Sequence, residues 1–228
     1  MKKLVFLTGA GVSAESGIKT FRDSDGLWEN YNVEDVATID AWYRNPQLMV
    51  DFYNARRREV EKAQPNDAHK IIGELQDDFD VTVITQNIDN LHERGGAKKV
   101  IHLHGEITKV CSERGKRFVK DIGYADQIFG EKAEDGNLLR PFIVWFGEDV
   151  PLLSKAAEEV EKADILVIIG TSLNVYPAAS LYMYASNNCP IYLIDPKEVQ
   201  THSHRIEFIQ KPATEGMRIL KEKLLQCK

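Results

Sequence analysis

Short runs of consecutive apolar residues recur along the chain, separated by longer polar or amphipathic stretches. Such runs are typical of strands that are buried on both faces. Helix-compatible stretches follow several of the runs, and this alternation indicates an α/β fold built on a parallel sheet. We expect its strands at residues 4–8, 81–85, 100–103, 165–169 and 191–194.

Two intervals between these strands are too long to be simple crossovers. The first, 23–79, has helical periodicity at 40–62 and 68–77, so we expect a helical insertion there. The second, 106–140, is rich in Gly, Lys, Glu and Asp with weak periodicity, which indicates a small module or a flexible loop. The sheet domain should then comprise residues 1–22, 80–105 and 141–228, ending in an amphipathic helix at 215–226.

The composition fits one main core with a smaller appendage. The 228 residues are 43% hydrophobic and carry a formal net charge of −6, which argues against a nucleic-acid partner or an anionic membrane surface. No apolar run is long enough to span a membrane, and no removable signal is visible. The three cysteines, Cys111, Cys189 and Cys227, lie far apart and suit a reducing compartment. We therefore expect a cytoplasmic monomer.

A glycine turn directly after the first expected strand is the first candidate site. Gly9 permits a tight turn, Gly11 lets the backbone approach an anion closely, and a helix opening near Ser13 presents unpaired amides. This pattern suits diphosphate binding. A glycine turn between a strand and a helix is also common as simple punctuation, so the turn alone leaves both interpretations open.

The residues after this turn differ from those of an ordinary dinucleotide-binding unit. The acidic ribose ligand expected about 20 positions on would fall near Glu29, outside any expected strand. The chain instead places Phe21 and Arg22 in a loop. A lid over the phosphate site and an ordinary surface loop are both compatible with this segment.

Polar side chains cluster where the second expected strand ends. Gln86, Asn87 and Asp89 occur there, at the edge where open α/β sheets bind their ligands. Asn87 and Asp89 could fix a ribose or a carboxamide by directional hydrogen bonds. The alternative is that Asp89 or Asn90 only caps the following helix.

Two histidines close the third expected strand. Strand alternation places His102 and His104 on one face, and Gly105 leaves space beside them for a substrate. A metal site with His92 or Cys111 is disfavoured because suitable acidic or cysteine pairs are missing. An imidazole that takes a proton from a hydroxyl is the better hypothesis, with a purely structural histidine as the alternative.

Several motifs in order along nearly the whole chain resemble those of the sirtuin family. They are the glycine turn with Ser13 to Gly17, then Thr20 to Arg22, Gln86 to Asp89, His104 with Gly105, Arg140 to Glu148, and Gly170 to Ala178. The resemblance implies a Rossmann-like NAD-binding domain. It also implies that NAD is surrounded by Gly9, Ala10, Gly11, Ala14, Phe21, Arg22, Gln86, Asn87, Asp89, Gly170, Thr171, Ser172, Asp195 and Ala213.

The same resemblance implies a catalytic set and an activity. His104 would be the base that deprotonates a ribose hydroxyl, with Asn87 and Asp89 holding the nicotinamide ribose and carboxamide. The expected activity is NAD-dependent removal of acyl groups from protein lysines, giving nicotinamide, O-acyl-ADP-ribose and free lysine. Many relatives carry Asn at the place of Leu193, which leaves the adenosine contacts open.

The expected substrate groove and acyl pocket follow from further matches. An acylated-lysine protein would lie between the loop near 174–176 and the strand that contains Val144, Phe146, Gly147 and Glu148. Tyr53 and Arg56 are three positions apart in an expected helix, a spacing that alone fits a core tyrosine beside a solvated basic face. In sirtuins that remove succinyl, malonyl or glutaryl groups, a Tyr and an Arg so spaced line the acyl pocket, with a small residue at the place of Ala37. We therefore expect desuccinylase and demalonylase activity, with deacetylation retained to an unspecified degree.

The chain departs from the family in the 106–140 module. Most sirtuins carry two cysteine pairs there that bind zinc, but this module has only Cys111, and Arg114 stands where its partner would be. We expect no metal. The module should instead be held by the packing of Val110, Phe118, Ile122, Tyr124, Ile128 and Phe129.

Two other function classes use the same sequence features. ADP-ribosyl transfer or NAD hydrolysis would occur in the same pocket with a different nucleophile. A non-enzymatic NAD-sensing module is disfavoured because binding alone needs no base such as His104. A hydride-transfer dehydrogenase is disfavoured because the early ribose acid is displaced.

Overall fold

A computed structural model describes residues 1–19, 27–28, 31–201 and 205–226. Its main sheet has six parallel strands. They are β1 (Lys3–Thr8), β4 (Asp80–Thr85), β5 (Val100–His102), β9 (Ile165–Ile169), β10 (Ile191–Ile194) and β11 (Ile206–Ile209). The expected α/β fold with a parallel sheet is confirmed. The sequence reasoning missed β11, a short edge strand whose Glu207 and Phe208 are exposed.

The order of the strands in the sheet indicates where a ligand would bind. The order is β11-β10-β9-β1-β4-β5: β4 and β5 follow β1 on one side, and β9, β10 and β11 are then added on the other side of β1. This is the Rossmann order, in which ligands bind where the direction of winding reverses. Here the reversal lies between β1 and β9, whose last paired residues are Thr8 and Ile169.

Helices cover both faces of this sheet because strand side chains alternate between the faces. Leu4 and Phe6 pack on the face covered by α4 (Asp67–Glu74) and α7 (Ala213–Leu225). Val5 and Leu7 pack on the opposite face, against α6 (Leu153–Glu161) and the 3-10 helix η3 (Ala178–Tyr184). All four strand side chains are fully buried. Each contributes about 1.5–3 kcal/mol through burial.

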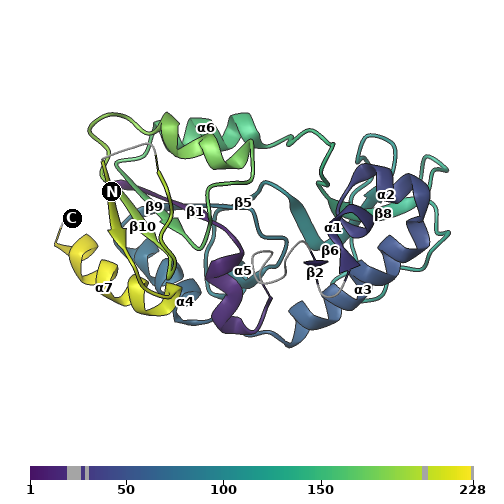
Figure 1. Cartoon of the computed structure of the whole chain (residues 1–228), viewed down its shortest axis with the longest axis horizontal. Helices are drawn as coiled ribbons and strands as arrows, with labels where there is room; N and C mark the ends of the chain where they lie inside the picture. The colour runs from purple at the N-terminus through teal and green to yellow at the C-terminus, as the bar shows by residue number, and fades with distance from the viewer. Residues whose placement is uncertain (20–26, 29–30, 202–204, 227–228) are drawn as a thin grey trace.

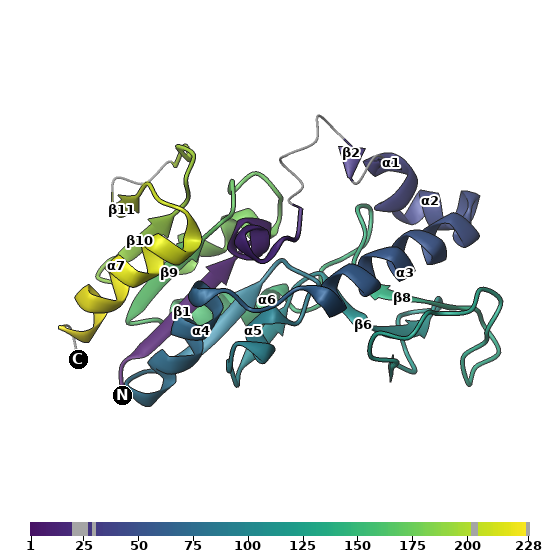
Figure 2. The same ribbon diagram turned by 90° about the horizontal axis from the view of Figure 1, so that it is seen from below.

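A smaller domain lies beside the main sheet along the long axis of the molecule (Figures 1 and 2). It contains α1 (Val33–Val36), α2 (Ile39–Arg44) and α3 (Pro46–Lys62). These helices pack on an antiparallel sheet of β6 (Gly105–Ser112), β7 (Lys120–Asp121) and β8 (Leu139–Ile143). Trp42 and Trp145 stack in its core with ring centroids 5.5 Å apart.

The remaining described elements are short. They are the 3-10 helices η1 (Ala10–Ser16) and η2 (Leu75–Asp77), the helix α5 (Leu91–Arg94), and the paired strands β2 (Leu27–Trp28) and β3 (Tyr31–Asn32). Within the part of the chain that the structure describes, no helix has the length and apolar character needed to cross a membrane.

The structure differs from the expected division of the chain at three places. The interval 40–62 holds two helices, because the side chain of Asn45 accepts a hydrogen bond from the backbone N–H of Leu48 and starts a new helix at Pro46. Helix α4 packs with α7 on the main sheet, although 23–79 was expected to be one insertion. Strand β8 pairs with β6, so its first residues belong to the small domain and the interval 106–140 contains an ordered sheet.

The expected packing of the 106–140 module is wrong for three of its members. Phe118, Ile128 and Phe129 are 41%, 66% and 39% exposed. Polar contacts to α3 hold this module instead. Asn54 donates to the Gln127 carbonyl and accepts from the Gln127 backbone N–H, both at 2.9 Å. The buried Arg57 donates through Nε to the carbonyl of Ile107 at 2.8 Å.

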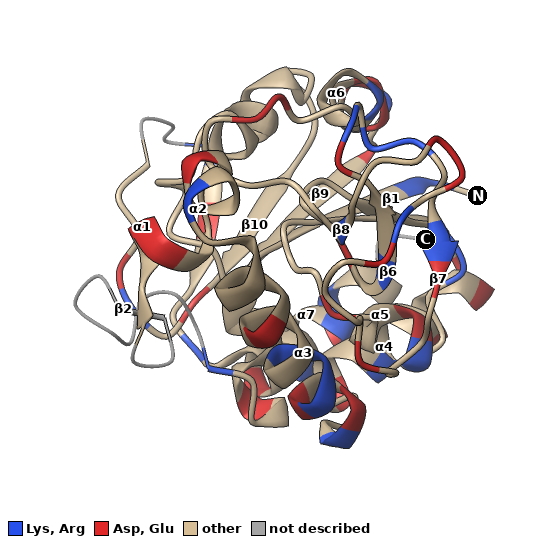
Figure 3. Cartoon of the chain, turned by 90° about the vertical axis from the view of Figure 1, so that its right-hand side faces the viewer, with Lys and Arg blue, Asp and Glu red and all other residues tan. Residues whose placement is uncertain are grey.

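Charges of both signs are mixed on the small domain. Figure 3 shows Lys and Arg beside Asp and Glu along α3 and around β6 and β7. One such pair joins Arg58 Nη1 to the carboxylate of Asp126 at 2.6 Å. This mixture agrees with the sequence, in which 29 Lys and Arg residues nearly balance 35 Asp and Glu residues.

Candidate active site

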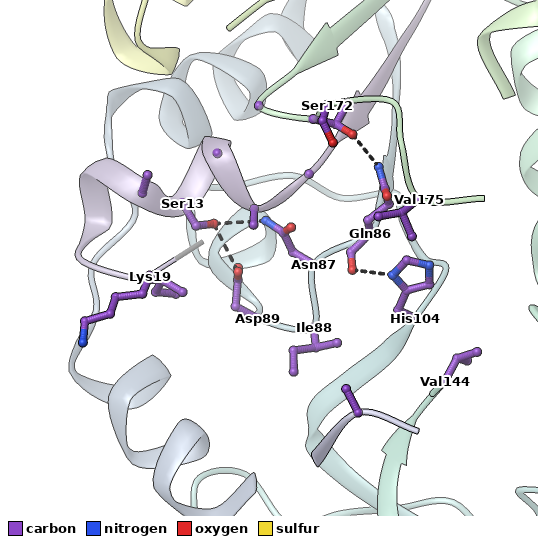
Figure 4. A pocket seen from close by; sticks show the side chains of 18 of the residues that line it. Ser13, Lys19, Gln86, Asn87, Ile88, Asp89, His104, Val144, Ser172 and Val175 are labelled. Atoms are coloured by element: carbon purple, nitrogen blue, oxygen red, sulfur yellow. Dashed lines mark hydrogen bonds between the residues drawn. The ribbon is translucent and has the colours of Figure 1, made fainter. Parts of the chain in front are cut away.

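A cavity of about 440 Å³ opens at the carboxyl ends of β1, β4 and β9 and extends to residues 143–148 of the small domain. It lies at the reversal of strand order described above (Figure 4). The structure brings together nearly all the expected site residues in its walls. They are Gly9, Ala10, Gly11, Ala14, Ala37, Tyr53, Gln86, Asn87, Asp89, His104, Val144, Phe146, Gly147, Glu148, Gly170, Thr171, Ser172, Asp195 and Ala213.

Two glycine-containing loops meet at the floor of the cavity. The N–H of Gly11 donates to the carbonyl of Gly170 at 2.9 Å, and a Cβ on Gly11 would lie 2.6 Å from the Cα of Gly170. A side chain at Gly11 or Gly170 would collide with the backbone of the other loop. The loops after β1 and β9 therefore present a wall of backbone to the cavity, which fits an elongated diphosphate such as that of NAD.

Ser13, on η1, lies at the centre of a buried polar network. Its hydroxyl donates to Asp89 Oδ2 at 3.1 Å and accepts from the Asn87 amide at 3.2 Å (Figure 4). His69 Nε2 lies 3.4 Å from the same hydroxyl. Because the Ser13 proton goes to Asp89, this nitrogen is the donor, and burial lowers the pKa of His69 to about 4. Ser13 thus orients the side chains of Asn87 and Asp89.

Asp89 is buried, and its carboxylate is satisfied from two sides. Oδ1 accepts from the backbone N–H of Leu91 at 3.0 Å, and Oδ2 accepts from Ser13. Burial raises the pKa of Asp89, and these two hydrogen bonds oppose the shift. Asp89 therefore contacts the first residue of α5 and also faces the cavity, whereas the N-cap residue Asn90 makes no side-chain capping bond.

His104 has a geometry that suits a base. Its Nδ1 lies 3.0 Å from the carbonyl oxygen of Gln86, which can only accept, so Nδ1 carries the proton. The lone pair is then on Nε2. Burial lowers the pKa of His104, so the ring is neutral at neutral pH. Gln86 also ties two loops together, because its amide donates to Thr171 Oγ1 at 3.1 Å.

The two histidines were expected on one face of a strand, but β5 ends at His102 and His104 lies in the turn before β6; His102 does not line the described cavity. Its Nδ1 lies 3.0 Å from the carbonyl oxygen of Asn87, and its Nε2 lies 2.7 Å from Glu93 Oε1. Among the residues that the structure describes, no group of three His, Cys, Asp or Glu side chains could hold a metal ion.

The surroundings of Cys111, the single cysteine of the 106–140 module, do not fit a zinc site. Cys111 is buried, and burial raises the pKa of its thiol to about 11, whereas zinc binds the thiolate. No described cysteine lies near enough to complete a cluster with it. The absence of zinc stays a prediction.

The end of the cavity that was expected to hold the acyl group is lined by Ala37 and Tyr53. Tyr53 is 1% exposed, and its hydroxyl oxygen accepts from the indole Nε1 of Trp145 at 2.8 Å. Burial raises the pKa of Tyr53 well above its ordinary value, so the phenol stays protonated. Arg56 does not line the cavity within the described residues; its guanidinium pairs with Glu59 and lies over the ring of Phe52.

The segment 144–148 is held between the two domains by backbone bonds. The N–H of Val144 donates to the His104 carbonyl, and the N–H of Phe146 donates to the Ala37 carbonyl, both at 2.9 Å. Gly147 then turns the chain with φ at +89°, a conformation that favours glycine. This segment therefore links the expected base to the expected acyl pocket.

Phe21 and Arg22, expected around NAD, lie outside the described residues. Leu193 is buried within β10 and does not line the described cavity, whereas Asp195, directly after β10, does. Gly105 was expected to leave space for a substrate, but its missing Cβ makes room for the Phe142 carbonyl, which would lie 2.0 Å from that atom.

Some cavity residues were not anticipated from the sequence. Ile88 and Trp145 are apolar and lie next to expected residues in the sequence, but they were not among the expected site residues. Ser13 was noted only as a helix start, although a small polar residue beside a glycine turn was a usable signal. Lys19 lines the cavity at the edge of the described segment 1–19 (Figure 4).

Known proteins share this architecture. Residues 9–177 match the Sir2 family. The chain is 54% identical over 231 residues to the NAD-dependent protein deacylase of Bacteroides thetaiotaomicron, covering 99% of each chain. It is 38% identical to a solved Sir2 homologue in complex with NAD, with a TM-score of 0.86, covering 99% of this chain and 90% of that one. A mutant Sir2 homologue bound to ADP ribose gives 39% identity and a TM-score of 0.90, covering 99% and 93%. This chain therefore belongs to the Sir2 family, the sirtuins.

Proposed function

We propose that this sirtuin, an NAD-dependent protein deacylase, removes succinyl and malonyl groups from protein lysines and acetyl groups to a lesser extent. One observation carries the proposal: a single cavity joins a neutral histidine with a fixed tautomer to an end lined by Ala37 and Tyr53. NAD, when bound, supplies the ribose carbon to which the acyl oxygen is transferred as nicotinamide leaves.

The chain's own residues have separable roles in this reaction. His104 accepts a ribose hydroxyl proton at Nε2, because its Nδ1 is already committed to Gln86. Asn87 and Asp89, oriented by Ser13, hold the ribose and the carboxamide. Ile88 and Trp145 add apolar walls that keep water away from the reacting atoms.

The acyl preference rests on Tyr53 and Arg56. A phenol that accepts one hydrogen bond from Trp145 can still donate its own proton, and a carboxylate is the strongest acceptor it could meet. Arg56 lies one turn further along α3 than Tyr53. The Arg56 side chain is largely buried and pairs with the half-exposed Glu59, so the proposal requires its guanidinium to turn from Glu59 toward an acyl carboxylate in the cavity.

The proposal is tested with peptides that carry acetyl-, malonyl- or succinyl-lysine, with products identified by mass spectrometry. We expect Tyr53→Phe and Arg56→Met to lower succinyl-lysine turnover more than acetyl-lysine turnover. Arg58→Met is the matched control, since Arg58 pairs with Asp126 at the surface. Equal losses for both acyl groups would contradict the assignment.

The same experiment separates the alternative activities. ADP-ribosyl transfer would give labelled protein without any need for acyl-lysine, and NAD hydrolysis would give free ADP-ribose. An NAD-sensing module would bind NAD and release no product. The cytoplasmic location and the monomeric state stay predictions.

A further inference from the structure

His102 is a buried titratable group that the proposed reaction does not use. It lies on β5, two residues before the proposed base, and is 8% exposed. Both of its ring nitrogens face acceptors: the Asn87 carbonyl oxygen at 3.0 Å and Glu93 Oε1 at 2.7 Å. A carbonyl can only accept, and so can an ionised carboxylate. An imidazole satisfies both only when it carries two protons.

His102, at the end of β5, and His104, in the following turn, bind consecutive carbonyls of one loop. His104 holds the carbonyl of Gln86, and His102 holds the carbonyl of Asn87. The Asn87 side chain faces the cavity while its carbonyl faces away toward His102. Because the peptide is planar, fixing this carbonyl also fixes the direction in which the chain enters Ile88 and Asp89.

We propose that His102 is a positioning residue: an imidazolium, paired with Glu93, that holds the Asn87 carbonyl and so sets the loop carrying Asn87 and Asp89. This inference rests on the proposed roles of those two residues. It assigns the two histidines opposite states, with His104 neutral as the base and His102 charged as the support.

The electrostatic surroundings agree with this assignment. Burial disfavours the charged ring, but Glu93, the Asn87 carbonyl and Glu106 outweigh it, so the pKa of His102 lies above its ordinary value. The pKa of Glu93 is lowered in turn, with burial opposing and His102 and Lys109 favouring the carboxylate. The other titratable groups that act on His102 are His92 on α5, which burial keeps neutral, and Asp89.

The protonation state of His102 determines how kcat depends on pH, because both contacts of its ring need a proton. Below the pKa of His102, both hydrogen bonds are present. Above it, the ring keeps one proton, the Glu93 carboxylate competes for it, and the Asn87 carbonyl then faces a lone pair. We expect kcat to fall as the pH rises through this pKa.

Three substitutions separate carbonyl binding from charge. The amide of His102→Asn can replace Nδ1 and keep the bond to Asn87, whereas the longer His102→Gln replaces Nε2 and keeps only Glu93. We expect kcat to fall roughly 10- to 100-fold in the Gln variant and clearly less in the Asn variant.

The variant Glu93→Gln tests the role of charge. Its neutral His102 ring donates to the Asn87 carbonyl and accepts from the new amide, so the fall in kcat at high pH should disappear. Glu106→Gln is the control, because it removes a nearby charge that makes no hydrogen bond to His102 and should leave that fall in place.

A measurement on the unmodified protein keeps the inference testable if variants fold poorly. Nitrogen-15 NMR of the histidine rings should show two protonated nitrogens for His102 at pH 7, with its signals assigned by their loss in His102→Asn. A neutral ring, or equal kcat values for the Asn and Gln variants, would overturn the inference. Turnover that survived His104→Ala would instead refute the proposed base and leave the NMR result standing.

Discussion

Arg140 and Glu148 form an ion pair with two hydrogen bonds beside the segment that links His104 to the end of the cavity lined by Ala37 and Tyr53. Arg140 Nη1 lies 2.7 Å from Glu148 Oε1, and Nη2 lies 2.9 Å from Oε2. The guanidinium also lies over the Trp145 ring, with Cζ 3.5 Å from its centroid. Glu148 in turn accepts from the Trp145 backbone N–H at 2.9 Å. The pair therefore closes the turn around Gly147 and orients Trp145, the partner of Tyr53.

Arg140→Lys should raise the peptide KM about tenfold while changing the KM for NAD much less. Lysine keeps the charge but cannot reproduce the two parallel bonds, and about 1.4 kcal/mol of lost binding corresponds to tenfold. Steady-state kinetics with each substrate varied in turn measures the two constants. Arg140→Met should additionally destabilise the fold by about 3–5 kcal/mol, because it leaves a half-buried carboxylate with only Lys116 nearby. Equal rises in both KM values would show that the pair does not act on the peptide side.

Acidification should inactivate the enzyme through His104. The base must be neutral to accept a proton, and burial holds the pKa of His104 below its ordinary value. On the acid side, kcat/KM should therefore decline only as the pH falls through that lowered pKa, separately from the fall in kcat at higher pH that His102 predicts. The profile of kcat/KM against pH on the acid side measures it. A decline that begins above the ordinary histidine pKa would contradict the buried, neutral ring.

The sequence predicted the main sheet well because its strands are continuous apolar runs that need no partner to be recognised. Val81 to Thr85 in β4 and Ile165 to Ile169 in β9 are examples. The small antiparallel sheet was missed because it depends on pairing between distant residues, such as Cys111 with Arg140, and its strand β7 is only two exposed residues long. Periodicity carries no information on such pairing.

The sequence predicted those site residues that lie together in one loop. It did not predict contacts between residues from two different elements. Asn87 and Asp89 follow one strand, so their side-chain types alone pointed to a site. Ser13 and His69 are 56 positions apart, and only the packing of α4 beside η1 brings them together. The contacts of His102 could not be predicted for the same reason. Its partners are the Asn87 carbonyl in the loop after β4 and Glu93 on α5, and only the fold brings them together with β5.

Gly105→Ala should abolish activity and strongly destabilise the protein. Gly105 has φ at +84°, and an added Cβ would lie 2.0 Å from the Phe142 carbonyl oxygen, so β6 and β8 could not pair as they do. The strain of the left-handed conformation adds about 1–2 kcal/mol to this clash. Thermal melting and NAD binding measure the effect. Gly115→Ala is the control, since it also has a positive φ but meets nothing within 4 Å.

A polar contact occupies the part of the small domain where most sirtuins bind zinc. The hydroxyl of the buried Ser112 donates to Asp135 Oδ2 at 2.7 Å, and Asp135 Oδ1 accepts from the Asn137 N–H at 3.1 Å. The first bond joins the end of β6 to the loop before β8, and the second fixes the Asp135 side chain within that loop. Ser112→Ala should therefore cost about 1 kcal/mol and lower the melting temperature by about 2–4 °C.

The same contact predicts how the protein responds to metal removal. Because Ser112 and Asp135 need no ion, treatment with a chelator should leave both the melting temperature and the deacylase activity unchanged. Elemental analysis of the purified protein should find no stoichiometric zinc. Ser112→Ala and chelator treatment then form a matched comparison: the first should lower the melting temperature and the second should not. A chelator that lowered it as much as the substitution would show that a metal ion, and not this hydrogen bond, holds the two segments together.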